Sequence, residues 1–169
     1  MSQMKAILAV VIALLASRAA SAAPDGKDAP RIAFFGFQLI NSSLEPTTAA
    51  ESARIRLLDD LFREKLSASG RFRIVNIPAA VEREIATSPA IGNCNGCERD
   101  FARKAGADRA AWGVVQKVSN LILNINVYME DAETGKMEFV RSVDVRSNSD
   151  DSWQRGFDYL LRNYLLREP

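Results

Sequence analysis

The sequence contains no histidine. Histidine is the usual general base near neutral pH, the usual partner of a serine or cysteine nucleophile and the commonest zinc ligand. Its absence argues strongly against a triad-type hydrolase. A tetrahedral zinc site would need ligands beyond Cys94 and Cys97, and the sequence has no other Cys or His to supply them. We therefore expect no catalytic residue, no metal and no cofactor.

A large excess of charge of either sign is also missing. The full chain has 22 Lys plus Arg and 21 Asp plus Glu, which gives a net charge of +1. Removal of residues 1–22 as a signal peptide would take away Lys5 and Arg18 and change the net charge to about −1. A nearly neutral protein has no strong field to attract phosphate backbones, so we expect no nucleic-acid partner. No segment after residue 22 is apolar enough to span a membrane.

Residues 1–22 have the pattern of a secretory signal peptide. Lys5 gives a positive start, residues 6–16 form an unbroken apolar run, and residues 20–22 form a small-x-small cleavage signature. The run is shorter than the roughly 20 residues that a bilayer-spanning helix needs, although an uncleaved anchor is the alternative. We expect export to the periplasm, a short disordered leader over residues 23–30 and a single domain over residues 31–167.

Hydrophobic periodicity predicts the order strand, helix, strand, two helices, three strands and a final helix. The expected strands cover residues 31–40, 72–77, 110–118, 121–129 and 137–146, and the expected helices start at Thr48, Pro78, Glu98 and Ser149. The predicted fold class is an α/β (α+β) single-domain sandwich. Its mixed sheet starts with a parallel β-α-β unit and ends in a C-terminal three-stranded antiparallel meander plus a helix.

Several side chains within these elements have expected roles. Thr48 and Glu51 have the spacing of a capping box. The aromatic residues of the last helix recur at helical spacing, which favours core packing over an aromatic docking stripe, and Trp112 is also expected in the core. In the last predicted strand, Arg141 interrupts the inward-facing series Phe139, Val143 and Val145. We therefore expect Arg141 at the sheet margin or paired with a carboxylate. The aromatic residues of the last helix are Trp153, Phe157 and Tyr164.

Cys94 and Cys97 are separated by Asn-Gly and precede a predicted helix. In an oxidising compartment this pair is expected to form a local structural disulfide that joins a loop to the helix. The alternative is a redox-active dithiol, because helix N-termini lower the pKa of a thiol and C-x-x-C pairs can cycle. The closed loop is so short that its stabilisation should lie near the low end of roughly 2–4 kcal/mol.

The middle strand of the meander alternates apolar and polar residues, which predicts one buried and one wet face. Asn124, Asn126 and Tyr128 lie on the wet side and form a possible interaction surface for a partner or a glycan, although an ordinary wet face is the alternative. The neighbouring carboxylates in the sequence, at residues 59–60, 131–133 and 150–151, are expected to act in turns or helix caps rather than in catalysis or metal binding.

Several motifs resemble known families. The strand from Ile32, the segment from Ala105 to Asp108 and the hairpin from Asp131 to Gly135 resemble N-terminal domains of the periplasmic TolB type, and the curli-secretion protein CsgG is built on a similar domain. The C-x-x-C motif, the meander that includes Asn124 and the helix start at Asn148 are similar to a secreted proteobacterial family of unknown function. The resemblance implies the fold and an envelope location.

Together these observations predict a non-enzymatic periplasmic protein that binds an envelope protein partner through its sheet edge or loops. The resemblance to domains of multiprotein envelope systems and the lack of catalytic residues support this interpretation. One alternative is a protein that binds a small ligand or a glycan at the Asn124, Asn126 and Tyr128 surface. The other is a thiol-disulfide protein that uses Cys94 and Cys97.

Overall fold

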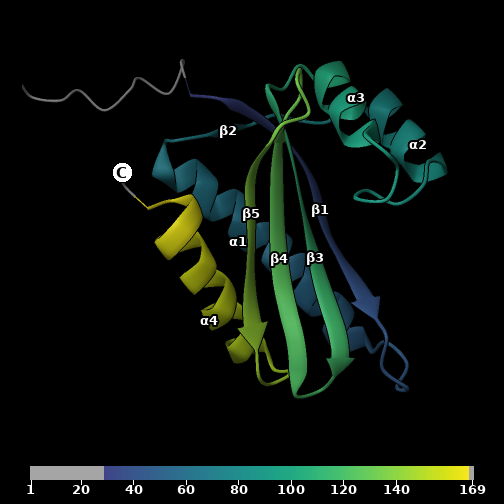
Figure 1. Ribbon diagram of the computed structural model, residues 1–169, viewed down its shortest axis with the longest axis vertical. Coiled ribbons are helices and arrows are strands. Elements are labelled where there is room, and N and C mark those ends of the chain that lie inside the picture. Colours follow the sequence, from purple (N-terminus) through teal and green to yellow (C-terminus); the bar gives the residue numbers. More distant parts are fainter. Residues whose placement is uncertain (1–28, 168–169) are drawn as a thin grey trace, which may run out of the picture.

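The computed structural model describes residues 29–167 (Figure 1). The predicted signal peptide over residues 1–22 and most of the predicted leader lie outside these residues. Pro30, the last residue of the predicted leader, contacts the domain, because its carbonyl oxygen accepts a hydrogen bond from the backbone N–H of Arg73 at 3.0 Å.

A five-stranded sheet has the strand order β2-β1-β3-β4-β5. β1 pairs in parallel with β2 and β3, whereas β3, β4 and β5 form an antiparallel meander. The strands are β1 (Arg31–Asn41), β2 (Arg73–Ile74), β3 (Arg109–Ser119), β4 (Ile122–Asp131) and β5 (Met137–Val145). This mixed sheet with its C-terminal meander confirms the predicted fold class.

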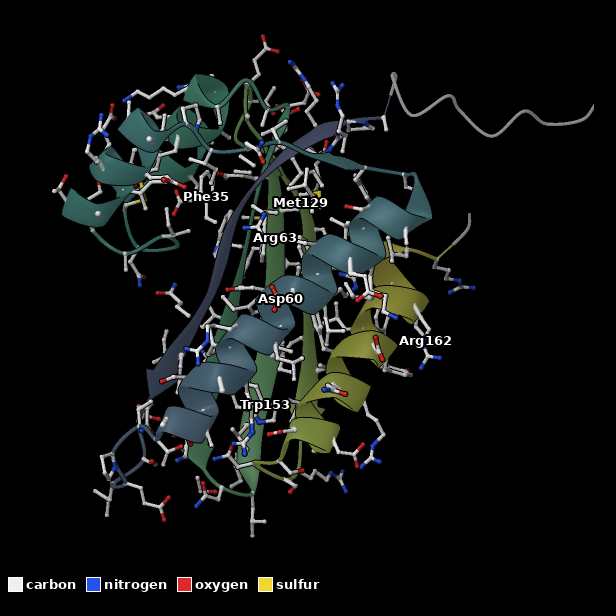
Figure 2. All side chains as sticks on the ribbon, turned by 180° about the vertical axis from the view of Figure 1, so that it is seen from behind. Phe35, Asp60, Arg63, Met129, Trp153 and Arg162 are labelled. Atoms are coloured by element: carbon white, nitrogen blue, oxygen red, sulfur yellow. A yellow bond between two sulfur atoms is a disulfide. The ribbon has the colours of Figure 1, made fainter. Side chains whose placement is uncertain are left out.

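The helices cover the two faces of the sheet unequally. α1 and α4 lie side by side along one face, where Trp153 is buried between them and the sheet (Figure 2). α2 and α3 lie over one end of the other face (Figure 1). The helices are α1 (Ala49–Ser69), α2 (Ala79–Thr87), α3 (Cys97–Lys104), α4 (Asp150–Leu160) and the π-helix η1 (Leu161–Leu165). Most of the second face is therefore left without a helical layer.

α1 begins with the predicted capping box. Thr48 Oγ1 accepts a hydrogen bond from the backbone N–H of Glu51 at 3.2 Å, and the Thr48 N–H donates to Glu51 Oε2 at 2.7 Å. These bonds satisfy two backbone donors that the helix itself leaves free. Leu58 and Phe62 have no exposed surface and define the face of α1 that packs on the sheet.

Aromatic rings fill the core between the sheet and helices α1 and α4. The ring of Phe34 stacks on Phe62 at 4.3 Å between centroids, and Phe37 meets Phe157 edge to face at 5.2 Å. Gly113 in β3 makes room for Phe37, because a Cβ atom built on Gly113 would lie 2.0 Å from that ring. The close approach explains a glycine in the interior of a central strand.

The predicted core role of the last helix is confirmed for Trp153 and Phe157 but is wrong for Tyr164, which is 44% exposed. From Leu161 onwards the chain forms a π-helix, whose wider turn directs Leu165 rather than Tyr164 toward the core. The guanidinium of Arg141 lies 5.6 Å from the Tyr164 ring centroid. Arg141 belongs to β5, which is an edge strand of the sheet, so its predicted position at the sheet margin is confirmed.

β1 contains a bulge in which Phe35 and Gly36 lie opposite the single residue Trp112 of β3. Gly36 has a φ of 84°, and the backbone N–H of Phe37 donates a hydrogen bond to Asp59 Oδ1 of α1 at 2.7 Å. Burial raises the pKa of Asp59, and the hydrogen bond from Phe37 opposes that rise. Asp59 therefore connects α1 to the bulge.

β2 is shorter than predicted. Residues 72–77 were expected to form a strand, but only Arg73 and Ile74 pair with β1. One further bond follows, from the Val75 N–H to the Ile32 carbonyl at 2.9 Å. The chain must then leave the sheet, because Pro78 is the N-cap of α2 and has no N–H to donate to a ladder.

A buried ion pair joins β3 to the start of α1. Lys117 Nζ lies 2.6 Å from Glu51 Oε1, and the two residues are 1% and 0% exposed. Burial alone would raise the pKa of Glu51, but hydrogen bonds from Lys117, Thr48 and Asn148 outweigh burial and lower this pKa to about 2. Asn148 precedes α4, so one carboxylate connects three parts of the fold.

Candidate interaction face

β4 divides its side chains between the two faces of the sheet. Leu123, Ile125, Val127 and Met129 are buried under α1 and α4, whereas Asn124, Asn126 and Tyr128 are only partly buried on the opposite face. The predicted alternation is confirmed. The structure thus brings the three residues of the predicted interaction surface onto one side of one strand.

We use the name open face for the part of this second sheet face that lies outside α2 and α3 (Figure 1). Strand pairing and alternation place residues of four strands on it. The open face comprises Gln38, Ile40, Trp112, Val114, Gln116, Val118, Ile122, Asn124, Asn126, Tyr128, Met137, Val140, Ser142 and the exposed Asp144.

Apolar side chains on the open face are unusually accessible to solvent. Five of them have exposed fractions near one half: Ile40 at 42%, Val118 at 56%, Ile122 at 61%, Met137 at 41% and Val140 at 45%. Single exposed apolar residues are normal, but several on one face of a sheet, among polar groups, are typical of an interaction surface.

The polar residues of the open face are partly satisfied by one another. Asn126 Nδ2 donates to the Val114 carbonyl at 3.1 Å and to Asn124 Oδ1 at 2.7 Å. The ring of Tyr128 stacks on Trp112 with 5.3 Å between centroids and an angle of 12°. These contacts hold the amides and the phenol ring in place, so the surface is ordered before any ligand arrives.

A groove of about 310 Å³ runs over the open face beside the loop that precedes α3. Gln38 and Gln116 bring amides to the groove, Trp112 and Tyr128 bring aromatic rings, and Gly92 belongs to the loop. Its lining is therefore a mixture of amide, aromatic and aliphatic groups without a charged side chain.

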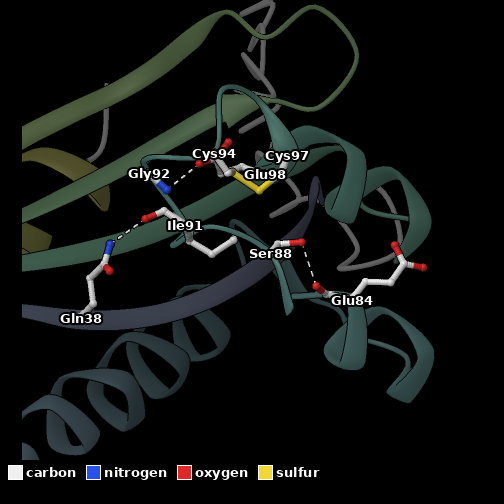
Figure 3. Close-up of a disulfide and its surroundings, with 8 residues drawn as sticks. All are labelled: Gln38, Glu84, Ser88, Ile91, Gly92, Cys94, Cys97 and Glu98. Atoms are coloured by element: carbon white, nitrogen blue, oxygen red, sulfur yellow. Dashed lines mark hydrogen bonds between the residues drawn. A yellow bond between two sulfur atoms is a disulfide. The ribbon is translucent and has the colours of Figure 1, made fainter. Parts of the chain in front are cut away.

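The loop beside the groove is fixed at several points (Figure 3). Cys94 and Cys97 form a disulfide, which confirms the predicted pairing. The Gly92 N–H donates to Glu98 Oε1 at 2.5 Å, and Gln38 Nε2 donates to the Ile91 carbonyl at 2.6 Å. The disulfide thus supports one wall of the groove, and its structural rather than redox role stays a prediction.

Cys94, Cys97 and Glu98 bring potential metal ligands within 4.8 Å of one another. Both sulfur atoms are bonded to each other in the disulfide, so neither is a thiolate ligand. The donor set that remains is one carboxylate, which already accepts the bond from Gly92. With the two cysteines joined in a disulfide, this group of residues does not fit a zinc site.

Sequence reasoning missed the part of the open face that comes from β1 and β5. Gln38 and Ile40 lie in the largely apolar strand expected over residues 31–40, where the polar Gln38 is a signal that one side of the strand is accessible. Val140 joins Tyr128 only through the pairing of β5 with β4. Trp112 is 6% exposed and belongs to the smaller core, as predicted, but it also lines the groove.

The fold and this surface define a small α/β domain with one sheet face under helices and the other largely open. Residues 30–165 match the family DUF3280, described as "Protein of unknown function (DUF2380)", and the chain belongs to this family. This confirms the predicted membership of a family of unknown function. A comparison with curated proteins finds no match.

Solved structures with a similar fold include the LpoB C-terminal domain from Salmonella enterica, with a TM-score of 0.52 and 14% identity over 70% of this chain and 83% of that chain. The LpoB C-terminal domain from Escherichia coli has a TM-score of 0.49 and 16% identity over 70% and 83% of the two chains. TolB from Acinetobacter baumannii has a TM-score of 0.47 and 16% identity over 78% of this chain and 28% of that chain. The first comparison shows a shared fold, and the resemblance to CsgG stays a prediction.

Within residues 29–167, every helix is too short or too polar to cross a bilayer.

Proposed function

We propose that this protein is a non-enzymatic periplasmic module that binds another envelope protein through its open face. The observation that carries this proposal is the set of exposed apolar side chains on the open face, from Ile122 at one end to Met137 at the other. The signal-peptide pattern of residues 1–22 supports export. The absence of histidine supports a role other than acid-base or triad catalysis.

Protein interfaces combine apolar contacts with hydrogen bonds, and the open face offers side chains for both. Burial of a half-exposed aliphatic side chain against a partner contributes on the order of 1 kcal/mol. The amides of Asn124 and Gln116 lie between the apolar residues and offer donors and acceptors. The opposite face of the sheet is already covered by α1 and α4, so it has no comparable surface to offer.

The test is site-specific photo-crosslinking in intact cells from Ile122 and Val140, followed by co-purification with two sets of variants. Ile122→Glu/Val140→Glu places charge on the open face and should reduce recovery of the crosslinked partner at least tenfold. Tyr159→Glu is the matched control, because Tyr159 is 49% exposed on α4, on the other side of the molecule. Equal recovery with both variants, or no crosslinked partner at all, would contradict the proposal.

A small ligand such as a glycan is the second candidate, because stacked rings and amides line the groove together. Aromatic faces pack against the apolar side of sugars, and amides bond their hydroxyls. Titration with N-acetylglucosamine oligomers should then raise the melting temperature of the mature protein, and Tyr128→Ala should abolish the rise. An unchanged melting temperature at millimolar oligomer would count against this candidate.

A further inference from the structure

A second pocket of about 310 Å³ adjoins the groove and contains two buried acidic side chains. Glu98 is 4% exposed and Glu130 is 7% exposed. Glu98 already accepts the hydrogen bond from Gly92. Glu130 Oε1, in contrast, is buried and has no hydrogen-bond partner among residues 29–167. A buried carboxylate oxygen without a partner is rare and costly, which points to a group that is supplied from outside.

The electrostatics of Glu130 agree with this geometry. Burial raises the pKa of Glu130, and the negative charge of Glu98 raises it further, while Arg99 opposes the rise. A cation bound beside Glu130 would replace the missing hydrogen-bond donor and favour the charged carboxylate.

The positive charge of Arg99 balances part of the negative charge in the pocket. Its guanidinium lies against Gly96 and Gly135, where a built Cβ atom would come within 2.4 and 2.3 Å of its nitrogens. The pocket is lined by one guanidinium and two carboxylates, which leaves about one negative charge when both carboxylates are ionised. That balance suits a monovalent cation better than a divalent metal ion.

The remaining walls indicate the shape of the cation. Trp112 and Met137 line the pocket together with the carboxylates, and both also line the groove on the open face. A lysine or arginine side chain has an apolar stem that packs on such walls and a charged head that reaches an acid. The ring of Trp112 adds a favourable surface for a cation.

We infer that this pocket receives a lysine or arginine side chain of the protein partner, with Glu130 as the main acceptor. The inference rests on the proposed function, because the pocket opens beside the surface where the partner would lie. It adds the chemistry by which that partner is recognised: a basic side chain next to a segment that covers the apolar residues.

The test uses the disulfide-bonded mature protein, labelled with nitrogen-15, and three acetylated and amidated peptides: Gly-Lys-Gly, Gly-Arg-Gly and Gly-Gln-Gly. The two cationic peptides should shift the amide resonances of Gly96, Arg99 and Glu130, and the neutral peptide should not. Glu130→Gln keeps the size of the side chain and should weaken binding of the cationic peptides at least tenfold. Glu133→Gln, in the exposed hairpin, is the matched control and should bind as the wild type does.

Equal shifts with the neutral peptide, no shifts with any peptide, or unchanged binding to Glu130→Gln would overturn the inference. Calcium chloride is titrated in parallel, and saturation of the same resonances by calcium at tenfold lower concentration would identify a metal site instead. Failure of the peptides leaves the proposed function intact if Ile122→Glu/Val140→Glu still loses its partner. Retention of the partner by that variant refutes the proposed function whatever the peptides do.

Discussion

At the scale of single residues, Gly113 has no space for a side chain. The Phe37 ring occupies the position of a Cβ atom at only 2.0 Å, and both residues lie in paired central strands. Gly113→Ala should therefore lower the free energy of unfolding by about 3 kcal/mol, the upper range for an overpacked core. Urea denaturation followed by tryptophan fluorescence measures the loss.

The same experiment on Phe37→Leu and on the double variant tests the cause. If the clash between the two side chains is responsible, the double variant should lose less stability than the sum of the single variants. Strict additivity would mean that Gly113 is needed for its backbone alone.

The buried pair of Glu51 and Lys117 gives the second prediction. Glu51→Leu leaves the Lys117 ammonium in the interior with only the exposed Glu45 carboxylate, 3.6 Å away, which should cost about 3 kcal/mol in the free energy of unfolding. Glu51→Leu/Lys117→Met removes both charges and should recover most of that loss, apart from about 1 kcal/mol for the hydrogen bond that the Thr48 N–H donates to Glu51 in the capping box. Guanidinium chloride unfolding of the two variants measures the difference. A double variant less stable than the single one would contradict this account.

At the scale of elements, the loop between α2 and α3 depends on its disulfide. Cys94→Ser/Cys97→Ser should reduce the free energy of unfolding by roughly 2 kcal/mol. This is near the low end for a disulfide, because the loop that the bond closes is very short. Hydrogen exchange should become faster for the Gly92 amide, which donates to Glu98 within this loop, while the central strands keep their protection. Thermal denaturation and exchange followed by NMR measure both effects.

An unchanged stability in that variant, together with mixed disulfides to other exported proteins in the wild type, would favour the redox alternative instead. A reduction potential above roughly −300 mV would point the same way, because structural bridges resist reduction more strongly.

Local signals in the sequence predicted most elements correctly. The capping box at Thr48 located the start of α1, and the alternation around Asn124 located β4 and its wet face. These signals succeed because each depends on residues only a few positions apart. The predicted β2 is too long, because Pro78 signals the exit from the sheet but not how many residues before it the pairing ends. The predicted core position of Tyr164 is wrong, because a π-turn leaves no clear local pattern.

The candidate site was predicted only in part for a related physical reason. One strand contains Asn124, Asn126 and Tyr128 at every second position. The alternation of apolar and polar residues therefore predicts that they lie on the same face. Ile40 reaches the same surface only because β1 lies next to β3, and that neighbour relation depends on the whole sheet. The buried state of Glu130 depends on how α3 and the hairpin close over it, which no spacing in the sequence encodes.

At the scale of the whole molecule, stability should fall in acid. Glu51 has an ordinary pKa of 4.5 and a folded pKa of about 2, and Asp108, which accepts hydrogen bonds from Arg31, changes from 3.8 to about 2. The unfolded chain therefore takes up these protons first as the pH drops. The stabilisation is complete above about pH 5 and is lost progressively between about pH 4.5 and 2.

Glu51→Gln should therefore give a shallower decline of the melting temperature between pH 5 and pH 2, with the exposed Glu64→Gln as its matched control. Scanning calorimetry in buffers of equal ionic strength measures the slopes. A decline as steep as that of the wild type would show that Glu51 does not contribute to acid sensitivity.

The strand order also affects how the chain reaches its native state. β3, β4 and β5 are joined by short turns, so their ladders close small loops and can form early. β1 comes first in the chain, yet its main neighbour is β3, and Arg31 bonds Asp108 across a separation of 77 residues. The first strand to be synthesised is thus among the last to be fully paired. Until β3 is in place, the apolar run of β1 lacks its main partner strand, which makes aggregation a risk while the chain folds.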